Sequence, residues 1–213
     1  MFFELTDLLT CPACGPAHGL VLLVQEVDDR RVKTGWLGCP NCRHDYPVSG
    51  GVADLRLEPD SSPPARPAVE DEELALKVVA LSGMSGERGF LLVGDRIAHA
   101  ATAVAELAQE LEVVALTTVP DGSLERHGVS RVLADVHFPL VEYRLRCVAI
   151  APGGNPEEVG AAARRVAAGG RLVLFDASDV DIEEVRRSGL TILASAGGTA
   201  VAERKLESLP VIG

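Results

Sequence analysis

Four cysteines in two closely spaced pairs are the residues of this sequence whose types and spacing best fit a chemical role. Cys11 and Cys14 form the first pair, in the stretch CPAC, and Cys39 and Cys42 form the second, in CPNC. A tight turn across each pair brings two thiolates to one side, and two such turns facing each other give the tetrahedral sulfur cage that zinc prefers. Because four thiolates fill the coordination sphere, the spacing predicts a structural zinc site rather than a catalytic one.

Two other uses of paired cysteines compete with zinc. A redox-active dithiol needs a strand–helix–strand setting, which is absent around both pairs. Disulfides belong to oxidising compartments, whereas the N-terminal segment is acidic where a secretory signal would be basic. The chain also has no apolar run of about 18 residues, the length that would span a membrane. We therefore expect a cytoplasmic protein, without membrane contact, whose cysteines are reduced.

Three further residues have alternative roles. His44 follows the second cysteine pair and is able to replace a thiolate ligand, but four thiolates suffice and a surface histidine is favoured. Cys147 lies in the apolar stretch RCVAIA, which favours a buried, inert thiol over a nucleophile. Trp36, the only tryptophan, is expected to pack over the cysteine turns, the alternative being an anchor for a protein partner.

A β-hairpin is expected to position the two cysteine pairs. Residues 19–39 read as two apolar strands on either side of a charged turn, DDRR. A module of fewer than about 60 residues has little core of its own, so metal ligation would hold residues 1–57 together. We therefore expect Cys39→Ser to release the metal and unfold residues 1–57, while the rest of the chain stays folded.

The N-terminal segment resembles a known family. The stretches LLTCPACG and LGCPNCRHDYPVSGGVADL are similar to the small zinc-ribbon activator proteins that partner methyltransferases acting on tRNA, rRNA and release factors. The matching positions are Leu9, Cys11, Pro12, Cys14, Cys39, Cys42, Tyr46, Pro47, Val48, Gly51 and Val52. The resemblance covers residues 1–57 and implies a ribbon that binds a methyltransferase domain.

A second domain follows a connector. Residues 58–68 are rich in proline, serine and acidic residues, which is typical of a stiff, exposed linker. Over residues 69–213, apolar strands alternate with helices, and two final strands are joined by Gly197-Gly198. Continuous apolar strands separated by helices predict a parallel sheet covered on both faces. The predicted fold class is therefore α/β: a four-cysteine zinc ribbon, then a Rossmann-like, mostly parallel sheet with a C-terminal antiparallel hairpin.

This second domain resembles the class I methyltransferases that use S-adenosylmethionine. The stretch LADVHFPL is similar to their third-strand segment, which ends in an acidic residue followed by a Leu-Pro-Phe-like turn. The stretch RRVAAGGRLVLFD is similar to their helix, Pro-Gly-Gly turn and fifth strand, with Ala168 where the family usually has proline. The resemblance covers about residues 69–206 and implies a cofactor site at the ends of the first strands.

The first of those strands departs from the family pattern. The family has an acidic residue and then a Gly-x-Gly turn, whereas the chain has LLVGDRIAH, with Gly94 alone. Arg96 and Ile97 fill positions where side chains would occupy cofactor space, and Asp95 is a displaced candidate for the acid. We expect this turn to be closed by its own side chains, with Arg96 directed outward or paired with an acid, and Ile97 packed into the sheet below the helix start.

The second and third strands carry the other cofactor positions. The family's ribose-binding acid is replaced by Thr117 and Thr118, with Asp121 some residues further on. Asp135 stands where the family binds the adenine amine, and its alternative role is to cap a turn. The stretch APGGNP lacks the aromatic residue of an amino-methylating motif, and Phe138 and Tyr143 are expected to pack. S-adenosylmethionine is therefore possible but disfavoured.

The charge of the chain bears on its partners. The formal net charge is −11, whereas nucleic-acid binding depends on cations placed against phosphates. Nucleic acid is therefore disfavoured, although four arginines, Arg164, Arg165, Arg186 and Arg187, leave a local basic patch open. The leading hypothesis is a zinc-binding interaction module fused to a non-catalytic methyltransferase-like domain, which binds another protein or itself. The alternative is an active methyltransferase that acts on RNA or a translation protein.

Overall fold

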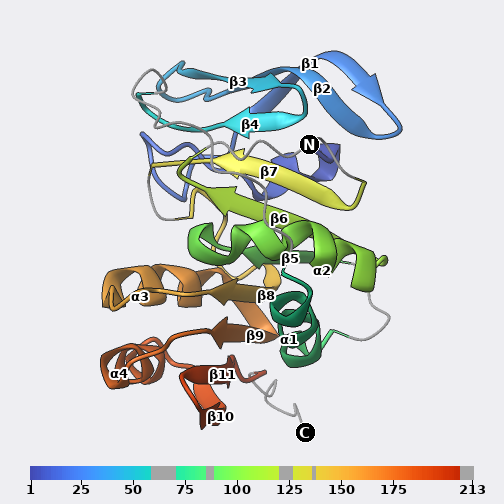
Figure 1. The fold of residues 1–213 in the computed structure, drawn as a ribbon. Coiled ribbons are helices and arrows are strands. Elements are labelled where there is room, and N and C mark those ends of the chain that lie inside the picture. Colours follow the sequence, from blue (N-terminus) through green and yellow to red (C-terminus); the bar gives the residue numbers. More distant parts are fainter. Residues whose placement is uncertain (59–70, 85–88, 120–126, 136–137, 207–213) are drawn as a thin grey trace, which may run out of the picture.

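The computed structural model describes residues 1–58, 71–84, 89–119, 127–135 and 138–206. All but the first residue of the predicted linker, 58–68, lies outside these ranges, as does most of the helical turn predicted at 121–128. Across the described residues, eleven strands form one sheet, in the order β1-β2-β3-β4-β7-β6-β5-β8-β9-β11-β10 (Figure 1). No helix of the described chain has the length and hydropathy needed to cross a membrane.

The N-terminal part is an antiparallel meander that follows a short 3-10 helix, η1 (Phe3–Leu8). Its strands are β1 (Val21–Asp28), β2 (Arg31–Gly38), β3 (Asp45–Ser49) and β4 (Val52–Asp54). Asp29 and Arg30 both have positive φ, 42° and 61°, between β1 and β2. Such a pair forms the turn type that matches the twist of a hairpin, so the predicted hairpin between the cysteine pairs is confirmed.

The second part contains five parallel strands and a closing hairpin. The parallel strands are β5 (Gly89–Val93), β6 (Leu111–Thr117), β7 (Val129–Leu133), β8 (Leu145–Ile150) and β9 (Val166–Leu174). The hairpin strands are β10 (Thr191–Ala196) and β11 (Thr199–Glu203), and β11 pairs antiparallel with β9. The strand order reverses between β5 and β8, which is the switch point where doubly wound sheets bind ligands. The predicted Rossmann-like α/β class is confirmed.

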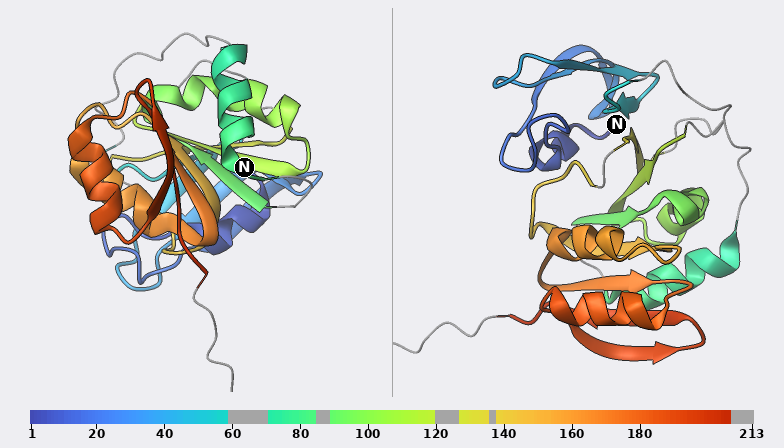
Figure 2. Two further views of the ribbon diagram at one scale, coloured as in Figure 1. Left: turned by 90° about the horizontal axis from the view of Figure 1, so that it is seen from below. Right: turned by 90° about the vertical axis from the view of Figure 1, so that its left-hand side faces the viewer.

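Helices cover both faces of this sheet. On one face lie α1 (Glu72–Ser82), the 3-10 helix η3 (Asp95–Ala100) and α2 (Ala101–Leu107); on the other lie α3 (Pro156–Arg165) and α4 (Asp179–Arg187) (Figure 2). Local signals explain where the helices begin. Asn155 accepts a hydrogen bond from the Glu157 amide at the start of α3, and Ser178 and Asp181 form a capping box on α4.

Two predicted helix boundaries are wrong. A helix was expected over residues 155–170, but α3 ends at Arg165 because Val166 already pairs with Leu145 in the parallel ladder. A single helix was expected over residues 96–111, but the chain forms η3, then α2, and enters β6 at Leu111. At the end of α3, pairing with a neighbouring strand prevails over the helical pattern of the sequence.

The two parts share one sheet and one cluster of buried side chains, which argues against the expectation that residues 1–57 unfold alone. Strand β4 pairs in parallel with β7, with Val52, Ala53 and Asp54 opposite Arg131, Val132 and Leu133. One cluster of buried side chains runs from Leu5, Leu37 and Tyr46 of the N-terminal part to Leu92, Val114 and Val148 of the parallel sheet. The boundary at residue 57 therefore divides the chain by sequence pattern and does not divide its core.

Candidate metal centre and cofactor region

The two cysteine pairs lie on turns with the same backbone hydrogen bonds. In the first turn, the Gly15 amide donates to the Cys11 carbonyl at 2.8 Å, and the Cys11 amide donates to the His18 carbonyl at 2.8 Å. In the second, the Arg43 amide donates to the Cys39 carbonyl at 2.8 Å. Gly15 and Arg43, the residues after each pair, have positive φ of 90° and 62°. Each turn therefore directs its two sulfur atoms to one side.

The four sulfur atoms meet in one cluster. The Sγ atoms of Cys11, Cys14, Cys39 and Cys42 all lie within 4.8 Å of one another. Cys11 and Cys42 are 3.7 Å apart, and Cys14 and Cys39 are 3.8 Å apart. The four cysteines are therefore placed to bind a single metal ion.

The neighbours of the cluster shape its protonation. Burial raises the pKa of Cys39, but the amides of Cys42 and Asn41 outweigh burial and lower it to about 7. A hydrogen bond with the His44 backbone lowers the pKa of the Cys42 thiol. Burial and hydrogen bonds with the other three thiols outweigh this effect and raise that pKa to about 12. Without a cation, one thiolate at Cys39 opposes ionisation of its neighbours. A divalent cation relieves this repulsion. The four cysteines are therefore better suited to bind a metal ion than to remain free thiols.

Tyr46 supports the cluster from the core side. Its side chain is buried, and its hydroxyl lies 3.3 Å from Cys11 Sγ. Burial, followed by the hydrogen bond with Cys11, raises the Tyr46 pKa well above its ordinary value, so the hydroxyl stays a neutral donor. Asn41 donates to Cys14 Sγ at 3.3 Å from the exposed side. Sequence patterns identified Tyr46 as a family position and did not predict its contact with sulfur.

The three other candidate residues of the sequence differ in how far they are buried. His44 is exposed and lies beside the Tyr46 ring, with centroids 4.6 Å apart, so the predicted surface histidine is confirmed. Cys147 is completely buried on β8, and burial raises its pKa to about 12, as expected of an inert thiol. Trp36 is 39% exposed, which contradicts the expectation that it packs over the cysteine turns.

The turn after β5 is closed by its own residues, as predicted. A Cβ at Gly94 would meet Ile150 Cγ2 at 2.7 Å, so the backbone lies directly on β8. Ile97 is buried in the core beneath α1 and α2. The Arg96 side chain is exposed, and its guanidinium covers Gly153, where a Cβ would meet Cζ at 2.6 Å. Arg96 and Ile97 therefore occupy the turn that the resemblance assigns to the cofactor loop.

The positions after β6 and β7 are also engaged. The Thr117 hydroxyl donates to the Val119 carbonyl at 2.9 Å, and Asp121 lies outside the described residues. Asp135 accepts a hydrogen bond from the Leu57 amide at 3.0 Å, so its carboxylate holds the segment that leaves the ribbon. Thr118 is exposed and has a partner of its own. The contact of Asp135 spans 78 positions, so it is a long-range tether rather than the turn cap predicted as the alternative.

The two aromatic residues after β7 differ in their environment. Phe138 is buried, as predicted, and its carbonyl accepts from the buried guanidinium of Arg165 at 2.8 Å. Tyr143 is 49% exposed, with the Arg204 guanidinium 4.8 Å from its ring centroid, so its packing is only partial. Neither ring lines the cleft beside the β5 turn.

A cleft of about 640 Å³ opens at the carboxyl ends of β5, β8 and β9. Its floor includes Ile97, Ala151 and Phe175, and charged side chains of α1, η3 and the turn after β9 surround it. Neither Thr117 nor Asp135 lines this cleft. This cleft therefore lies away from the two strands whose ends would carry the ribose and adenine contacts.

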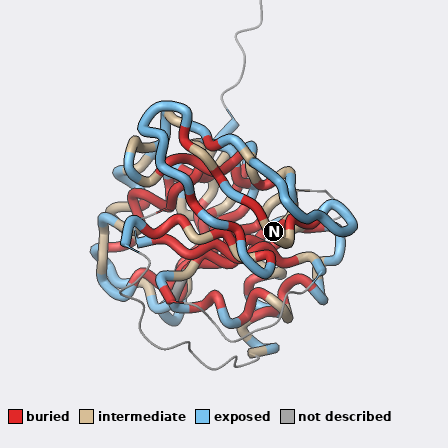
Figure 3. The backbone as a smooth tube through the Cα atoms, turned by 90° about the horizontal axis from the view of Figure 1, so that it is seen from above, coloured by how far each residue is buried: buried red, intermediate tan, exposed pale blue. Residues whose placement is uncertain are grey.

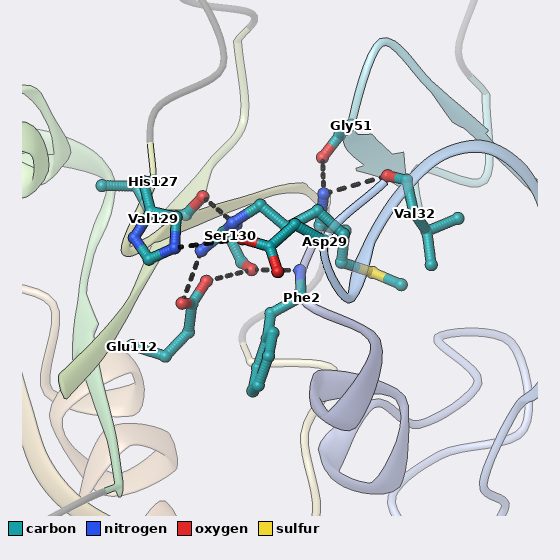
Figure 4. A network of polar contacts seen from close by, with 10 residues as sticks. Phe2, Asp29, Val32, Gly51, Glu112, His127, Val129 and Ser130 are labelled. Carbon is teal, nitrogen blue, oxygen red and sulfur yellow. Dashed lines mark hydrogen bonds and ion pairs between the residues drawn. The ribbon is translucent and has the colours of Figure 1, made fainter. Parts of the chain in front are cut away.

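A polar network joins the ribbon to the parallel sheet beside the β4–β7 ladder (Figure 4). The largely buried carboxylate of Glu112 accepts from the buried guanidinium of Arg31 at 2.6 Å and from the Ser130 hydroxyl at 2.6 Å. Ser130 in turn accepts from the Phe2 amide at 2.8 Å, and Arg31 also donates to the Val129 carbonyl at 3.0 Å. These residues are 18 to 128 positions apart, so no sequence spacing signalled the network.

A second junction connects the first cysteine turn to the loop before β8. The Thr10 amide donates to the Pro139 carbonyl at 2.9 Å, and the Val141 amide donates to the Leu8 carbonyl at 2.8 Å. Leu9 and Leu140 are bridge partners, and both are buried. The chain entering the metal cluster is therefore held by the α/β part.

Comparisons with known proteins concern the fold alone. No protein-family model and no curated protein sequence matches the chain. One similar solved structure is the antibiotic-resistance methyltransferase Kmr, with 12% identity and a TM-score of 0.46 over 65% of this chain and 95% of that one. Another is the precorrin-6y C5,15-methyltransferase from Geobacter metallireducens GS-15, with 13% identity and a TM-score of 0.46 over 69% and 96%. The assignment of a methyltransferase-like fold rests on the strand order and the terminal hairpin described above.

Proposed function

We propose that this chain is a non-catalytic, methyltransferase-like protein whose zinc-bound ribbon serves as a built-in partner of its own α/β sheet. Its activity would be to bind another protein rather than to transfer a methyl group. The observation that carries the proposal is the parallel pairing of β4 with β7, which places the ribbon on the edge of the sheet. The ribbon's exit segment then engages Asp135, the one retained-looking cofactor position.

Zinc is the metal that this donor set favours. Four thiolates around an ion with Zn–S bonds of about 2.3 Å would be separated by about 3.8 Å in a regular tetrahedron. Two of the sulfur separations, 3.7 Å and 3.8 Å, agree with that spacing, and all lie within 4.8 Å. With four protein ligands and no open position, the metal would be structural and would contribute to folding.

Loss of methyl transfer is supported by the cofactor region. A cofactor with an amino-acid end and a nucleoside end needs space at the ends of β5, β6 and β7. Instead, Gly94 lies against Ile150, Ile97 is part of the core, and Asp135 is bonded to the Leu57 amide. The active alternative retains one argument, because the sheet keeps its switch point between β5 and β8.

Calorimetry with S-adenosylmethionine and S-adenosylhomocysteine tests the non-catalytic assignment. We expect dissociation constants weaker than about 1 mM, which corresponds to less than about 4 kcal/mol of binding free energy. The melting temperature should likewise stay constant in millimolar cofactor, because only a ligand that binds the folded state raises it. A rise of several degrees that Asp135→Ala abolishes would instead establish the active methyltransferase.

Elemental analysis of protein purified without chelator tests the metal. We expect one zinc per chain, and we expect Cys39→Ser to lose it because only three thiolates remain. Cys147→Ala is the matched control, since it removes a thiol outside the cluster and should keep the zinc. Protein without zinc, or equal loss of zinc in both variants, would refute the assignment.

A further inference from the structure

The outward face of the ribbon carries a row of apolar side chains across three strands. Leu23 of β1 pairs with Trp36 of β2, and Trp36 pairs with Pro47 of β3, so these residues share a face. Val21, two residues before Leu23, belongs to the same face. Val21, Leu23 and Trp36 are 53%, 55% and 39% exposed, and Pro47 is also exposed. We call these four residues the outer patch.

The opposite face of the same strands is the one that packs. Leu22, Leu37 and Tyr46 are paired across β1, β2 and β3, and all three belong to or pack against the core. The hairpin therefore uses one apolar face for folding and keeps a second apolar face in contact with solvent. Viewed from the ribbon side, much of the backbone there is exposed (Figure 3). An apolar patch that folding does not use is typical of an interaction site.

The position of β1 adds a free strand edge to this patch. Among the described strands, β1 is at one end of the sheet and pairs only with β2. Its ladder is regular from Val21 to Val24 and becomes irregular between Val24 and Glu26. An extended segment is therefore able to add its own hydrogen bonds along Val21–Val24, and every second side chain of that segment would continue the outer patch.

The charges around the patch indicate the chemistry of the occupant. Glu26, Asp28 and Asp45 are exposed, and none of them has an ion-pair partner among the described residues. The arginines of the hairpin are not available to neutralise them, because Arg30 pairs with Glu4 and Arg31 pairs with Glu112. The patch is thus apolar with an acidic border.

We propose that the outer patch binds an extended segment of another protein that presents aliphatic residues at alternate positions, with lysine or arginine at both ends of that row. The aliphatic side chains would cover Leu23 and Trp36, and the cations would face Glu26, Asp28 and Asp45. A second copy of this chain fits poorly, since each copy brings the same acidic border and a net charge of −11. The proposal is independent of the metal and of the cofactor region.

Trp36 makes the test direct because it is the only tryptophan. The probe is the capped nonapeptide Lys-Thr-Val-Thr-Val-Thr-Val-Thr-Lys, titrated into the full-length protein while tryptophan emission is recorded. We expect a saturable shift to shorter wavelength, and no shift with a peptide that has glutamate in place of lysine. Leu23→Ser should weaken binding at least tenfold, whereas Leu76→Ser, at a 57% exposed position on α1, should leave it unchanged.

A charge variant separates this surface from general attraction to an acidic protein. Glu26→Gln combined with Asp28→Asn should weaken binding and reduce its dependence on salt. The proposal is overturned if the lysine peptide does not shift the emission up to about 1 mM, a standard binding free energy near 4 kcal/mol, or if Leu23→Ser binds as well as the wild type. It is also overturned if emission shifts with protein concentration alone, since that result identifies a second copy as the occupant.

Discussion

Individual cysteines serve two purposes in this chain, and the surroundings of each thiol decide which one. The four ribbon cysteines lie beside backbone amides and one another, which favours ionisation of Cys39 and binding of a cation. Cys147 lies in the parallel sheet, where burial raises its pKa to about 12. Because this thiol is fully buried and lies outside the cluster of four, it is not a nucleophile near neutral pH and has no metal to bind.

Cys147 is predicted to resist alkylation in the native protein. At pH 8 its thiol is neutral and buried, so iodoacetamide should modify it only after denaturant is added. Mass spectrometry of tryptic peptides measures the adduct. Modification of Cys147 in the folded protein at the rate of the unfolded protein would contradict the inert assignment.

The raised Cys147 pKa also predicts a pH dependence of stability. Above about pH 8.5 the unfolded thiol ionises, while the folded thiol stays neutral up to about pH 12. The free energy of unfolding should therefore fall in this window by up to about 1.4 kcal/mol per pH unit. Urea unfolding of Cys147→Ala should show a shallower decline, and identical slopes in both proteins would refute the prediction.

Asp135 provides a residue-scale test of the cofactor region. Asp135→Ala removes the acceptor of the Leu57 amide and should reduce the free energy of unfolding by about 0.5–1.5 kcal/mol. We expect no change in the affinity for S-adenosylmethionine, because the carboxylate holds backbone rather than adenine. Calorimetry and urea unfolding of the same sample measure both quantities. Loss of cofactor binding without loss of stability would be the opposite result.

At the scale of elements, the contact between β4 and β7 explains the ribbon's position. Strand β4 has only three residues, so few backbone hydrogen bonds hold it to β7. The stability of this ladder therefore depends on the side-chain contacts next to it. The Arg31–Glu112–Ser130 network lies next to this ladder. It joins the start of β2 to the starts of β6 and β7. The resemblance of the ribbon to methyltransferase activators implied contact with a methyltransferase domain, and the contact observed is within the chain.

A double-mutant cycle on the Arg31–Glu112 pair tests this joint. Glu112→Leu alone should destabilise the protein by about 3–5 kcal/mol, because it leaves the buried Arg31 guanidinium without a counterion. Arg31→Met combined with Glu112→Leu should cost much less than the sum of the single changes. Urea unfolding measures each free energy, and additive losses would show that the pair does not act as a unit.

At the scale of the whole molecule, one sheet and one core extend from the metal cluster to the parallel strands. Leu9 pairs with Leu140, and the core cluster includes Cys11, Cys39 and Val148. A disturbance at the cluster therefore reaches the α/β part through packed side chains. The ribbon and the sheet should unfold together rather than in sequence.

Cys39→Ser is now predicted to destabilise the entire chain. Loss of the metal loosens the ribbon, and the edge of β7 then loses its β4 partner. We expect a single unfolding transition at lower temperature, with reduced hydrogen-exchange protection at Val129–Leu133. Calorimetry and hydrogen exchange measure these effects, with Cys147→Ala as the comparison. A second transition at the wild-type temperature would support two independent cores instead.

The sequence by itself determined the features that depend on neighbouring residues. The cysteine spacing indicated two metal-binding turns, Asn155-Pro156 marked the start of α3, and the apolar runs identified the parallel strands and the final hairpin. Gly94, with Arg96 and Ile97 after it, also indicated a closed turn, in agreement with the contacts of these residues. These signals are local because turns, caps and strand periodicity are set within a few residues.

The tertiary structure alone decided how the two parts meet. The pairing of β4 with β7 joins residues about 80 positions apart, and the Phe2–Ser130 contact spans 128 positions. The exposure of Trp36 was also decided by tertiary structure. Leu37 and Tyr46 pack on the core, so the opposite face of the hairpin, with Leu23 and Trp36, stays in solvent. No local pattern distinguishes these outcomes, since a hairpin with two apolar faces can bury either one until the rest of the chain supplies the core.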